Sequence, residues 1–261
     1  MISSPSFNPG VRLWVWGMIG FSLQVTVAYG GGSSGSDTTA PMRISSLNQC
    51  YDALFQQHAR SGLQVQPTAE HGGRIERILR FQPDLVLANR FNNPLLVNAL
   101  QAQEQRVEIL PEPASLGEVD DFFQQLGQLT GIPFPMNRDQ LPQLFAAQRV
   151  LMLQANHYSF GADTLWNELV EALGGHNVAP GSGLVTVLPE QVLRLDPDLI
   201  VVLGHADFAL AARNLLHGAL APLLNERAVA VDADLVGCMA QRVDALIENL
   251  AAACCPLKGN R

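Results

Sequence analysis

Apolar runs and helically spaced apolar residues alternate along most of this chain. Short apolar runs bounded by turn residues are typical of buried strands, and apolar residues three or four positions apart are typical of helices. The predicted strands cover residues 42–47, 85–88, 107–110, 149–154, 199–204 and 228–232. The predicted helices include "NQCYDALFQQHA", residues 73–81, "PLLVNALQAQ" and "ADTLWNELVEALGG". Strands that alternate with helices predict an α/β fold, with mainly parallel sheets flanked by helices.

Two stretches of the chain repeat one pattern 114 residues apart: "ERILRFQPDLVLA", which starts at Glu76, and "EQVLRLDPDLIVV", which starts at Glu190. Six of their thirteen aligned positions are identical. Each stretch predicts a short helix, a Pro-Asp break and an apolar strand. Because similar strands and helices surround both copies, the repeat predicts two lobes of similar architecture.

The segment between the two repeats predicts a helical connector. Apolar residues follow helical spacing from Leu116 to Leu129, "GIPFP" then breaks the helix, and "DQLPQLFAAQ" predicts a second, short helix that contains Pro142. We expect an N-terminal lobe at 42–114, the connector at 115–148 and a C-terminal lobe at 149–261. Since α/β sheets bind ligands beyond the carboxyl ends of their strands, this order predicts a ligand cleft between the lobes.

The first 41 residues have the composition of a leader and a linker. Arg12 precedes a long apolar run, and small residues follow around Ala28, so residues 1–30 predict a secretory signal peptide. Residues 31–41 are rich in Gly and Ser and predict a flexible linker. An uncleaved membrane anchor is the alternative. No cysteine lies near the predicted cleavage region, which disfavours a lipid anchor, and we expect an exported protein.

Composition restricts the partners. The chain has 261 residues, of which 48% are hydrophobic, and it can bury one large core or two modest ones. Its formal charge of −8 argues against binding to nucleic acid, which needs a basic face. The four cysteines are Cys50, Cys238, Cys254 and Cys255. An oxidising compartment would permit a disulfide, but the sequence leaves the pairing open.

The usual catalytic motifs do not occur in the sequence. There is no glycine-rich phosphate or dinucleotide loop after a strand, and "PGSGL" at 180–184 predicts a loop rather than a nucleophile turn. We therefore expect neither enzymatic activity nor a resident cofactor. An exported two-lobe enzyme stays open as an alternative, since one fold hosts many functions.

Five segments in a fixed order resemble a known family: "RISSLNQCYDAL", "ERILRFQPDLVLA", "EPASLGEV", "SFGADTLWNELVEALGGHNVA" and "EQVLRLDPDLIVV". They are similar to the periplasmic substrate-binding proteins of ABC importers for ferric siderophores, cobalamin and haem, and the resemblance covers residues 42–253. It implies a protein that captures a metal chelate between two lobes and delivers it to a permease dimer. We expect a monomer. The short second connector helix departs from the long helix of the family.

The resemblance implies that one surface glutamate per lobe pairs with permease arginines. The matching positions here are Glu76 and Glu190. Independently, two anionic side chains placed equivalently on similar lobes can bind a two-fold symmetric cationic surface. The alternative is a local role, because carboxylates in the first turn of a helix stabilise it, and Pro189 suits the first helical position.

Ligand-binding residues are expected in the loops that follow the strands. Aromatic faces with a few polar groups suit a bulky, partly apolar ligand, and an arginine suits an anionic group. The candidates are Asn48, Gln49, Tyr51, His71, Arg90, Phe91, His157, Tyr158, Phe160, His205 and Arg242.

The histidines raise alternatives of the same fold. His71, His157 and His205, with Asp207, could bind bare zinc or manganese. Tyr158 or a histidine could instead bind haem iron. The sequence does not choose among a siderophore, a corrinoid, haem and a bare metal ion.

Overall fold

The computed structural model of this chain describes residues 40–57, 62–134, 141–203 and 218–254. All of them belong to one compact unit, which begins at Thr39. The predicted signal peptide therefore lies outside the described residues. In the described part of the chain, no helix is long and apolar enough to cross a membrane.

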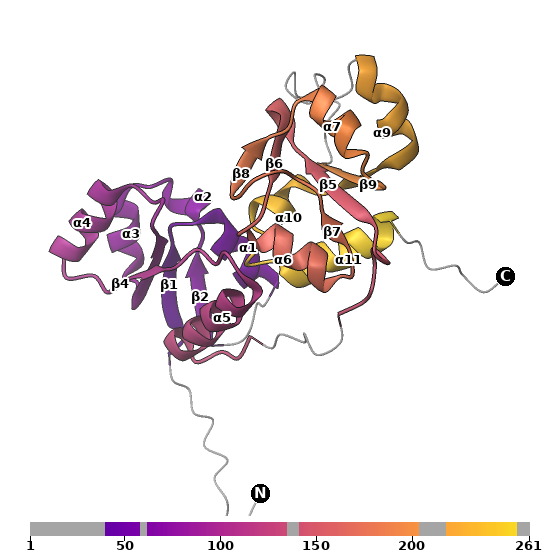
Figure 1. The fold of residues 1–261 in the computed structure, drawn as a ribbon. Helices are drawn as coiled ribbons and strands as arrows, with labels where there is room; N and C mark the ends of the chain where they lie inside the picture. The colour runs from indigo at the N-terminus through magenta and orange to yellow at the C-terminus, as the bar shows by residue number, and fades with distance from the viewer. Residues whose placement is uncertain (1–39, 58–61, 135–140, 204–217, 255–261) are drawn as a thin grey trace, which may run out of the picture. The chain divides into compact units, whose positions relative to one another are not determined.

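The first half folds around a four-stranded parallel sheet (Figure 1). Its strands are β1 (Met42–Ser46), β2 (Leu63–Gln66), β3 (Leu85–Asn89) and β4 (Val107–Leu110), in the order β2-β1-β3-β4. Its helices are α1 (Gln49–Gln57), α2 (Thr68–His71), α3 (Ile75–Phe81) and α4 (Pro94–Ala102), and α5 (Leu116–Thr130) follows. The strands and helices predicted for this half are confirmed. The structure adds two short elements that were not predicted, β2 and α2.

The second half repeats this arrangement. Its parallel sheet contains β5 (Arg149–Leu153), β7 (His176–Asn177), β9 (Leu199–Leu203) and β10 (Ala228–Val231), in the order β10-β9-β5-β7. Its helices are η1 (Ala155–His157), α6 (Leu165–Ala172), α7 (Pro189–Leu195), η2 (Gly218–Leu220), α9 (Ala221–Arg227), α10 (Ala233–Gly237) and α11 (Val243–Cys254). Read from β7, the order matches that of the first sheet strand for strand. An additional antiparallel pair, β6 (Tyr158–Phe160) and β8 (Leu184–Thr186), has no counterpart in the first sheet.

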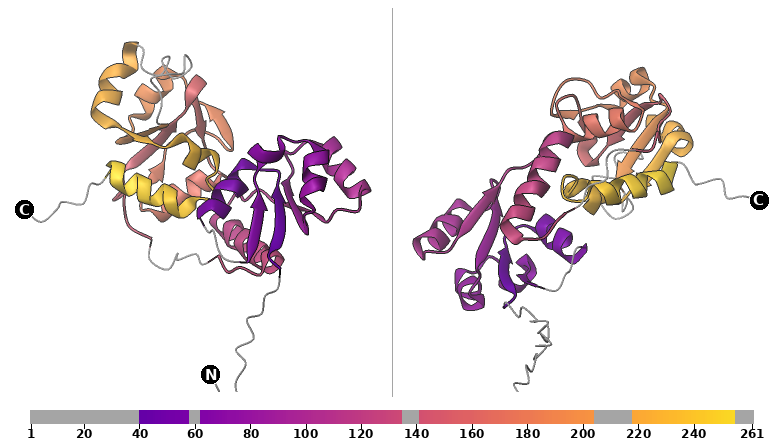
Figure 2. Two further views of the ribbon diagram at one scale, coloured as in Figure 1. Left: turned by 180° about the vertical axis from the view of Figure 1, so that it is seen from behind. Right: turned by 90° about the horizontal axis from the view of Figure 1, so that it is seen from below.

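Helices cover both faces of each sheet because alternate strand residues point to opposite faces. In β3, Leu85 and Leu87 pack in the cluster that contains α1 and α5, whereas Val86 and Ala88 pack with α3 and α4. In β5, Val150 and Met152 pack with α6, α10 and α11, whereas Leu151 and Leu153 pack with α7 and α9. Figures 1 and 2 show these layers. The predicted α/β fold with helices on both faces is confirmed.

One hydrophobic cluster is shared by the two halves. It joins residues of α1 and α5 with residues of α6, α10 and α11. Its largest fully buried side chains include Trp166, Tyr51 and Phe122. The centroids of the Tyr51 and Phe122 rings lie 5.8 Å apart. The face of the first sheet that packs on α1 and α5 and the face of the second sheet that packs on α6, α10 and α11 thus belong to one continuous core.

The repeated Pro-Asp break has a structural reason. Gln82 and Asp196 end α3 and α7 in the left-handed conformation, with φ of 51° and 42°. Two residues later, Asp84 accepts the Arg43 backbone N–H at 2.7 Å and donates its own N–H to the Arg43 carbonyl, also at 2.7 Å. Asp198 makes the same two bonds with Arg149, both at 2.9 Å. Each aspartate therefore joins the start of a central strand to the segment that leads into its neighbour.

The second half of the connector differs from the prediction. The first connector helix is confirmed as α5, with Ser115 as its N-cap and Gly131 as its left-handed C-cap. Residues 141–148, expected within a second helix, are not helical. Ala146 and Ala147 have φ of 44° and 64°, which a helix does not allow. The segment is held instead by Phe145, which is buried in the core and donates its N–H to Leu173.

A disulfide joins the two halves. Cys50 on α1 bonds to Cys238, which follows α10, across 188 residues of sequence. The sequence had left this pairing open. A crosslink between elements so far apart in the chain restricts the unfolded state strongly.

The aspartate bonds predict a matched loss of stability in the two halves. Changing Asp84 or Asp198 to Ala removes the bond to the strand N–H and should lower the free energy of unfolding by about 1 kcal/mol in each case. Asp84→Asn and Asp198→Asn keep an acceptor oxygen and should lose less. Urea unfolding measures the free energy of unfolding of each variant. The control is Asp121→Ala, which removes an exposed carboxylate on α5. Equal losses in the Ala and control variants would contradict the assigned role.

The disulfide predicts a redox-dependent stability. The double variant Cys50→Ser/Cys238→Ser should unfold with a free energy lower by about 2–4 kcal/mol. Thermal unfolding with and without reductant measures this effect. Reductant should lower the melting temperature of the parent protein toward that of the variant and leave the variant unchanged. A parent protein insensitive to reductant, with thiols shown to be reduced, would refute the prediction.

Candidate functional site

A pocket of about 240 Å³ lies beyond the carboxyl ends of strands from both sheets. Residues that follow β4 form one wall, and residues that follow β5 and β10 form the others. The lining residues are Glu112, Pro113, Ala114, Phe160, Asp163, Thr164, Leu165, Trp166, Leu184, Val236, Gly237, Met239 and Ala240. We call this the shared pocket. Its location agrees with the expected cleft between the lobes, at the edge where parallel sheets bind ligands.

Local structure explains why these residues meet. Thr164 is the N-cap of α6: its hydroxyl accepts the Asn167 N–H at 3.2 Å, so α6 begins at the pocket. Gly237 precedes Cys238, whose disulfide to α1 fixes this wall against the first half. The Leu116 N–H donates to Glu168 on α6 at 2.7 Å, which links the start of α5 to the second half.

The polar groups that line the pocket include two carboxylates. Glu112 is half-buried and accepts a long bond of 3.5 Å from the Asn89 side chain at the end of β3. Asp163 is exposed and accepts the Ser182 hydroxyl at 2.7 Å. Among the described residues that line the pocket there is no Lys, Arg or His. The electrostatic character of this wall is therefore negative.

Two buried donors, one on the pocket wall and one that interacts with Glu112, have no hydrogen-bond partner. Trp166 lines the pocket and is 1% exposed, and its Nε1 is unpartnered. The Tyr51 hydroxyl is also buried and unpartnered. Burial raises the pKa of the Tyr51 phenol, and the Glu112 carboxylate raises it further. The phenol therefore stays protonated, and an unpaired buried donor of this kind is costly unless a ligand or water accepts from it.

The β6–β8 pair extends the pocket wall outward. Phe160 pairs with Leu184, and Tyr158 pairs with Thr186. Directly paired residues and alternate residues of a strand lie on the same face, so these four side chains share one face. Phe160 and Leu184 line the pocket, while Tyr158 is 42% exposed and Leu184 61%. We call these four residues the aromatic shelf.

Of the eleven ligand-binding candidates, Phe160 lines the shared pocket and Tyr158 adjoins it on the shelf. His157 immediately precedes the shelf, and its Nδ1 is buried without a partner. Arg242 lies two residues beyond Ala240, with its Nε buried and unpartnered. His205, and also Asp207 of the suggested metal set, lie outside the described residues.

The candidates of the first half do not line the shared pocket. Asn48 accepts the Cys50 N–H at 2.7 Å at the start of α1, beside the exposed Gln49. The Arg90 guanidinium lies over the Phe91 ring, 4.8 Å from its centroid, and Phe91 is 70% exposed. Tyr51 is buried in the shared core.

His71 has a structural environment. It is 1% exposed, and its Nε2 donates to the Ser46 carbonyl at 2.8 Å while Nδ1 accepts the Gly73 N–H at 3.0 Å. Both ring nitrogens are thus engaged by backbone. Within the described ranges, no three His, Cys, Asp or Glu side chains come together as a metal site.

Several lining residues were not predicted from the sequence. Most of the predicted ligand-binding residues lie in the loops after the first, second, fourth and fifth predicted strands. The same rule applied after the two closing strands, "VEIL" and "AVAVD", finds Glu112 and the segment from Val236 to Ala240. Leu184 had no such signal, because β8 was not predicted.

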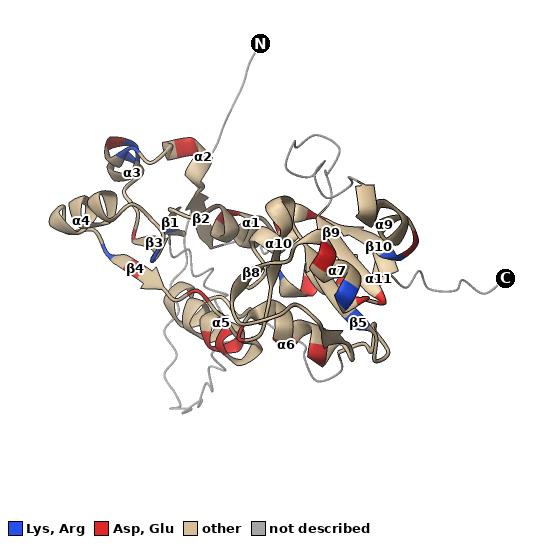
Figure 3. Ribbon diagram, turned by 45° about the horizontal axis from the view of Figure 1, so that its top comes forward, with Lys and Arg blue, Asp and Glu red and all other residues tan. Residues whose placement is uncertain are grey.

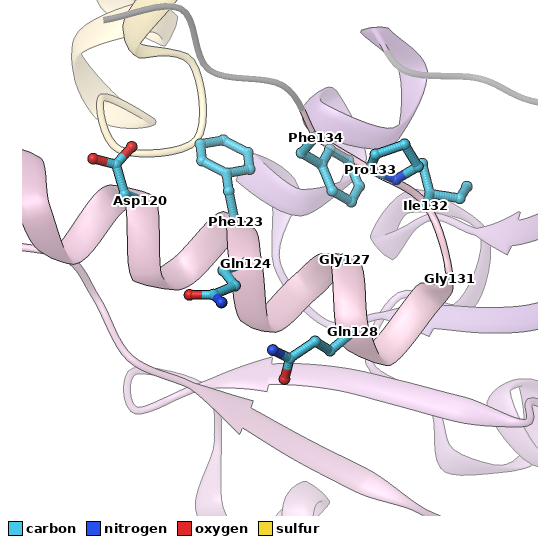
Figure 4. A pocket seen from close by; sticks show the side chains of 9 residues that line it. All are labelled: Asp120, Phe123, Gln124, Gly127, Gln128, Gly131, Ile132, Pro133 and Phe134. Carbon is cyan, nitrogen blue, oxygen red and sulfur yellow. The ribbon is translucent and has the colours of Figure 1, made fainter.

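A second hollow, of about 740 Å³, lies along α5 and the turn that follows it (Figure 4). Its lining residues all fall between Asp120 and Phe134. Figure 4 shows Gln124 and Gln128 on the same helix as Phe123. Because a single segment forms this hollow, it does not lie between the carboxyl ends of the two sheets. The shared pocket, although smaller, is the better candidate site.

The two docking candidates occupy equivalent places in the two halves. Glu76 and Glu190 are exposed in the first turns of α3 and α7, each of which leads into the third strand of its sheet. Both helices carry acidic and basic positions (Figure 3). Arg80 and Arg194 follow the glutamates by four residues, a spacing that also supports a helix-stabilising role.

No family model and no curated protein matches the sequence. Solved structures do match. A possible iron-binding, periplasmic solute-binding protein from Staphylococcus epidermidis has a TM-score of 0.59 and 18% identity, covering 80% of this chain and 97% of that one. A periplasmic haem-binding protein from Pseudomonas aeruginosa has a TM-score of 0.58 and 20% identity, covering 82% and 93%. An ABC transporter substrate-binding protein from Listeria monocytogenes has a TM-score of 0.55 and 15% identity, covering 82% and 99%.

These identities are low, and the likeness is one of fold. It extends over nearly the whole of each related structure and over the described part of this chain. The fold that the five sequence segments predicted is therefore confirmed. This chain shares the two-lobed α/β fold of these solved solute-binding proteins.

Proposed function

We propose that this protein is the substrate-binding component of an ABC importer. It captures a metal chelate, of the iron–siderophore or cobalamin type, in the shared pocket and delivers it to a membrane permease dimer. The observation that carries this proposal is the pocket itself, whose walls come from the carboxyl ends of both sheets. The aromatic shelf beside it suits a ligand with apolar surface.

Haem is the second candidate ligand. The Pseudomonas aeruginosa relative is a haem-binding protein, and another fold relative with a TM-score of 0.60 was solved with two haems. In this chain, Tyr158 is exposed beside the pocket and could bind haem iron. Direct titration distinguishes haem from a siderophore or corrinoid chelate as the ligand.

The periplasm is the compartment that fits the chain. The Cys50–Cys238 disulfide needs an oxidising environment, and residues 1–30 have the composition of a signal peptide. The fold relatives from Staphylococcus epidermidis and Pseudomonas aeruginosa are both described as periplasmic. In this setting, the exposed Glu76 and Glu190 would meet arginines of the permease, one glutamate from each half.

Intrinsic fluorescence tests ligand binding directly. The tryptophans of the chain are Trp14, Trp16 and Trp166, so a protein that begins at residue 31 keeps Trp166 alone, on the pocket wall. A bound coloured chelate should quench Trp166 in a saturable way. The titration panel is haem, cobalamin, ferric hydroxamates and zinc. A Soret shift would identify haem, and saturation by none of the panel would contradict the proposed function.

We expect a double variant to lose docking to the permease while it keeps ligand binding. Glu76→Lys/Glu190→Lys should leave chelate affinity unchanged, because neither residue lines the pocket, and should abolish uptake by cells that depend on this importer. The control Glu226→Lys/Glu248→Lys makes the same charge change at exposed positions of α9 and α11 and should retain uptake. Normal uptake by the first variant would rule out the assigned docking residues.

Removal of the exposed ring from the shelf should weaken chelate binding. We expect Tyr158→Ala to lower affinity about tenfold, since a buried aromatic contact is worth about 1 kcal/mol or slightly more. Tyr158→Phe keeps the ring and should bind a siderophore or corrinoid chelate normally, whereas it should lose affinity if the hydroxyl binds haem iron. Unchanged affinity in Tyr158→Ala would remove this residue from the site.

A further inference from the structure

We propose that the shared pocket receives a cationic or neutral end of its ligand and discriminates against anionic ends. This inference rests on the proposed function and specifies the class of chelate. It selects ferric hydroxamates and corrinoids, whose net charge is neutral or positive, over catecholate siderophores and haem, which carry negative charge.

The charges on the pocket wall carry the inference. Glu112 and Asp163 belong to opposite halves of the chain and both line the pocket. In the described part of the lining, no basic side chain offsets them. Two carboxylates that line one pocket attract a cation and repel an anion, and this repulsion is stronger in a partly dehydrated site than in water.

The environment of Glu112 makes its charge effective inside the protein. The Asn89 amide lies at the limit of hydrogen-bond distance from Oε2, 3.5 Å, and is a neutral partner. Burial raises the pKa of the Tyr51 phenol, and the Glu112 carboxylate raises it further. Asp163 is held by the Ser182 hydroxyl, which is also neutral. Neither carboxylate is therefore neutralised by the partners that hold it.

The basic groups near the pocket that belong to the described residues occupy other positions. Arg242 is close in sequence to the lining residue Ala240 but does not line the pocket. Arg90 lies over the Phe91 ring at the end of β3. His157, beside the shelf, likewise does not contribute to the lining.

The size of the pocket limits what enters it. Pockets that enclose a whole drug-sized ligand measure about 300–1,000 Å³. At about 240 Å³, the shared pocket accommodates only one end of a metal chelate. The remainder would lie over the aromatic shelf, against Tyr158 and Leu184, which are exposed. The charge of the inserted end should then decide affinity, while the shelf contributes contacts that are less sensitive to charge.

The unpartnered donors favour a ligand end that also offers an acceptor. Trp166 Nε1 is buried on the pocket wall with no partner. An amide carbonyl of the chelator chain is a neutral acceptor that could bind this N–H without bringing a negative charge near Glu112. A carboxylate or catecholate would supply the acceptor together with the repulsion.

Three ferric chelates of one linear trihydroxamate test the inference. They share the metal centre and differ only at the chain end, which is a free amine, an acetylated amine or a succinylated amine. The ends are cationic, neutral and anionic at pH 7. Affinity is measured by quenching of Trp166 in the protein that begins at residue 31. We expect the succinylated chelate to bind about tenfold or more weakly than the free amine.

Two neutralising variants locate the effect. Glu112→Gln and Asp163→Asn should each reduce the ratio of affinities between the amine and succinyl chelates, and the double variant should bring it to within about twofold. Glu226→Gln, an exposed position on α9, is the control and should keep the parent ratio. Circular dichroism and thermal unfolding confirm that the variants are folded.

Several outcomes overturn the inference. Equal or tighter binding of the succinylated chelate would do so, as would a ratio that persists in the double variant. Tighter binding of haem, which carries two propionates, than of the amine chelate would also overturn it, while the proposed transport function would stand. Saturation by none of these compounds, cobalamin included, would remove the proposed function together with the inference.

Discussion

Parallel strand pairing is the constraint on which this structure depends. In a parallel sheet every strand ends at the same edge, so the loops that leave the strands gather there. The chain builds such a sheet twice, with the same strand order in each half. Residues after β4 in the first half and after β5 and β10 in the second therefore form one pocket, although the segments at 112–114 and 236–240 lie more than a hundred residues apart in the sequence.

The two halves are held together by three independent features. A continuous hydrophobic cluster joins α1 and α5 to α6, α10 and α11. The Cys50–Cys238 disulfide ties α1 to the segment beside the pocket, and the bond from Leu116 to Glu168 ties α5 to α6. Under the proposed function, such links favour a largely preformed pocket and at most modest hinge motion on ligand binding.

Much of this fold is readable from the sequence, because its apolar runs are buried on both faces and its helices are amphipathic. β6, β7 and β8 contain only two or three residues each, too few to show a period, and only tertiary pairing defines them. The prediction of a second connector helix was wrong, because Pro142 and the backbone at Ala146 and Ala147 favour a loop. At the site, Phe160 was predicted as a ligand contact and lines the pocket, whereas Glu112 was missed although it follows a predicted strand. The Cys50–Cys238 pair could not be chosen by spacing alone.

The central claim is that one ligand contacts both halves at once. Hydrogen–deuterium exchange of the protein, with and without a saturating ferric trihydroxamate, tests it most directly. The account predicts slower exchange of Ala114 and of the segment from Val236 to Ala240 in the same complex, because both line the shared pocket. Protection confined to one half, or protection along α5 between Asp120 and Phe134 instead, would contradict it.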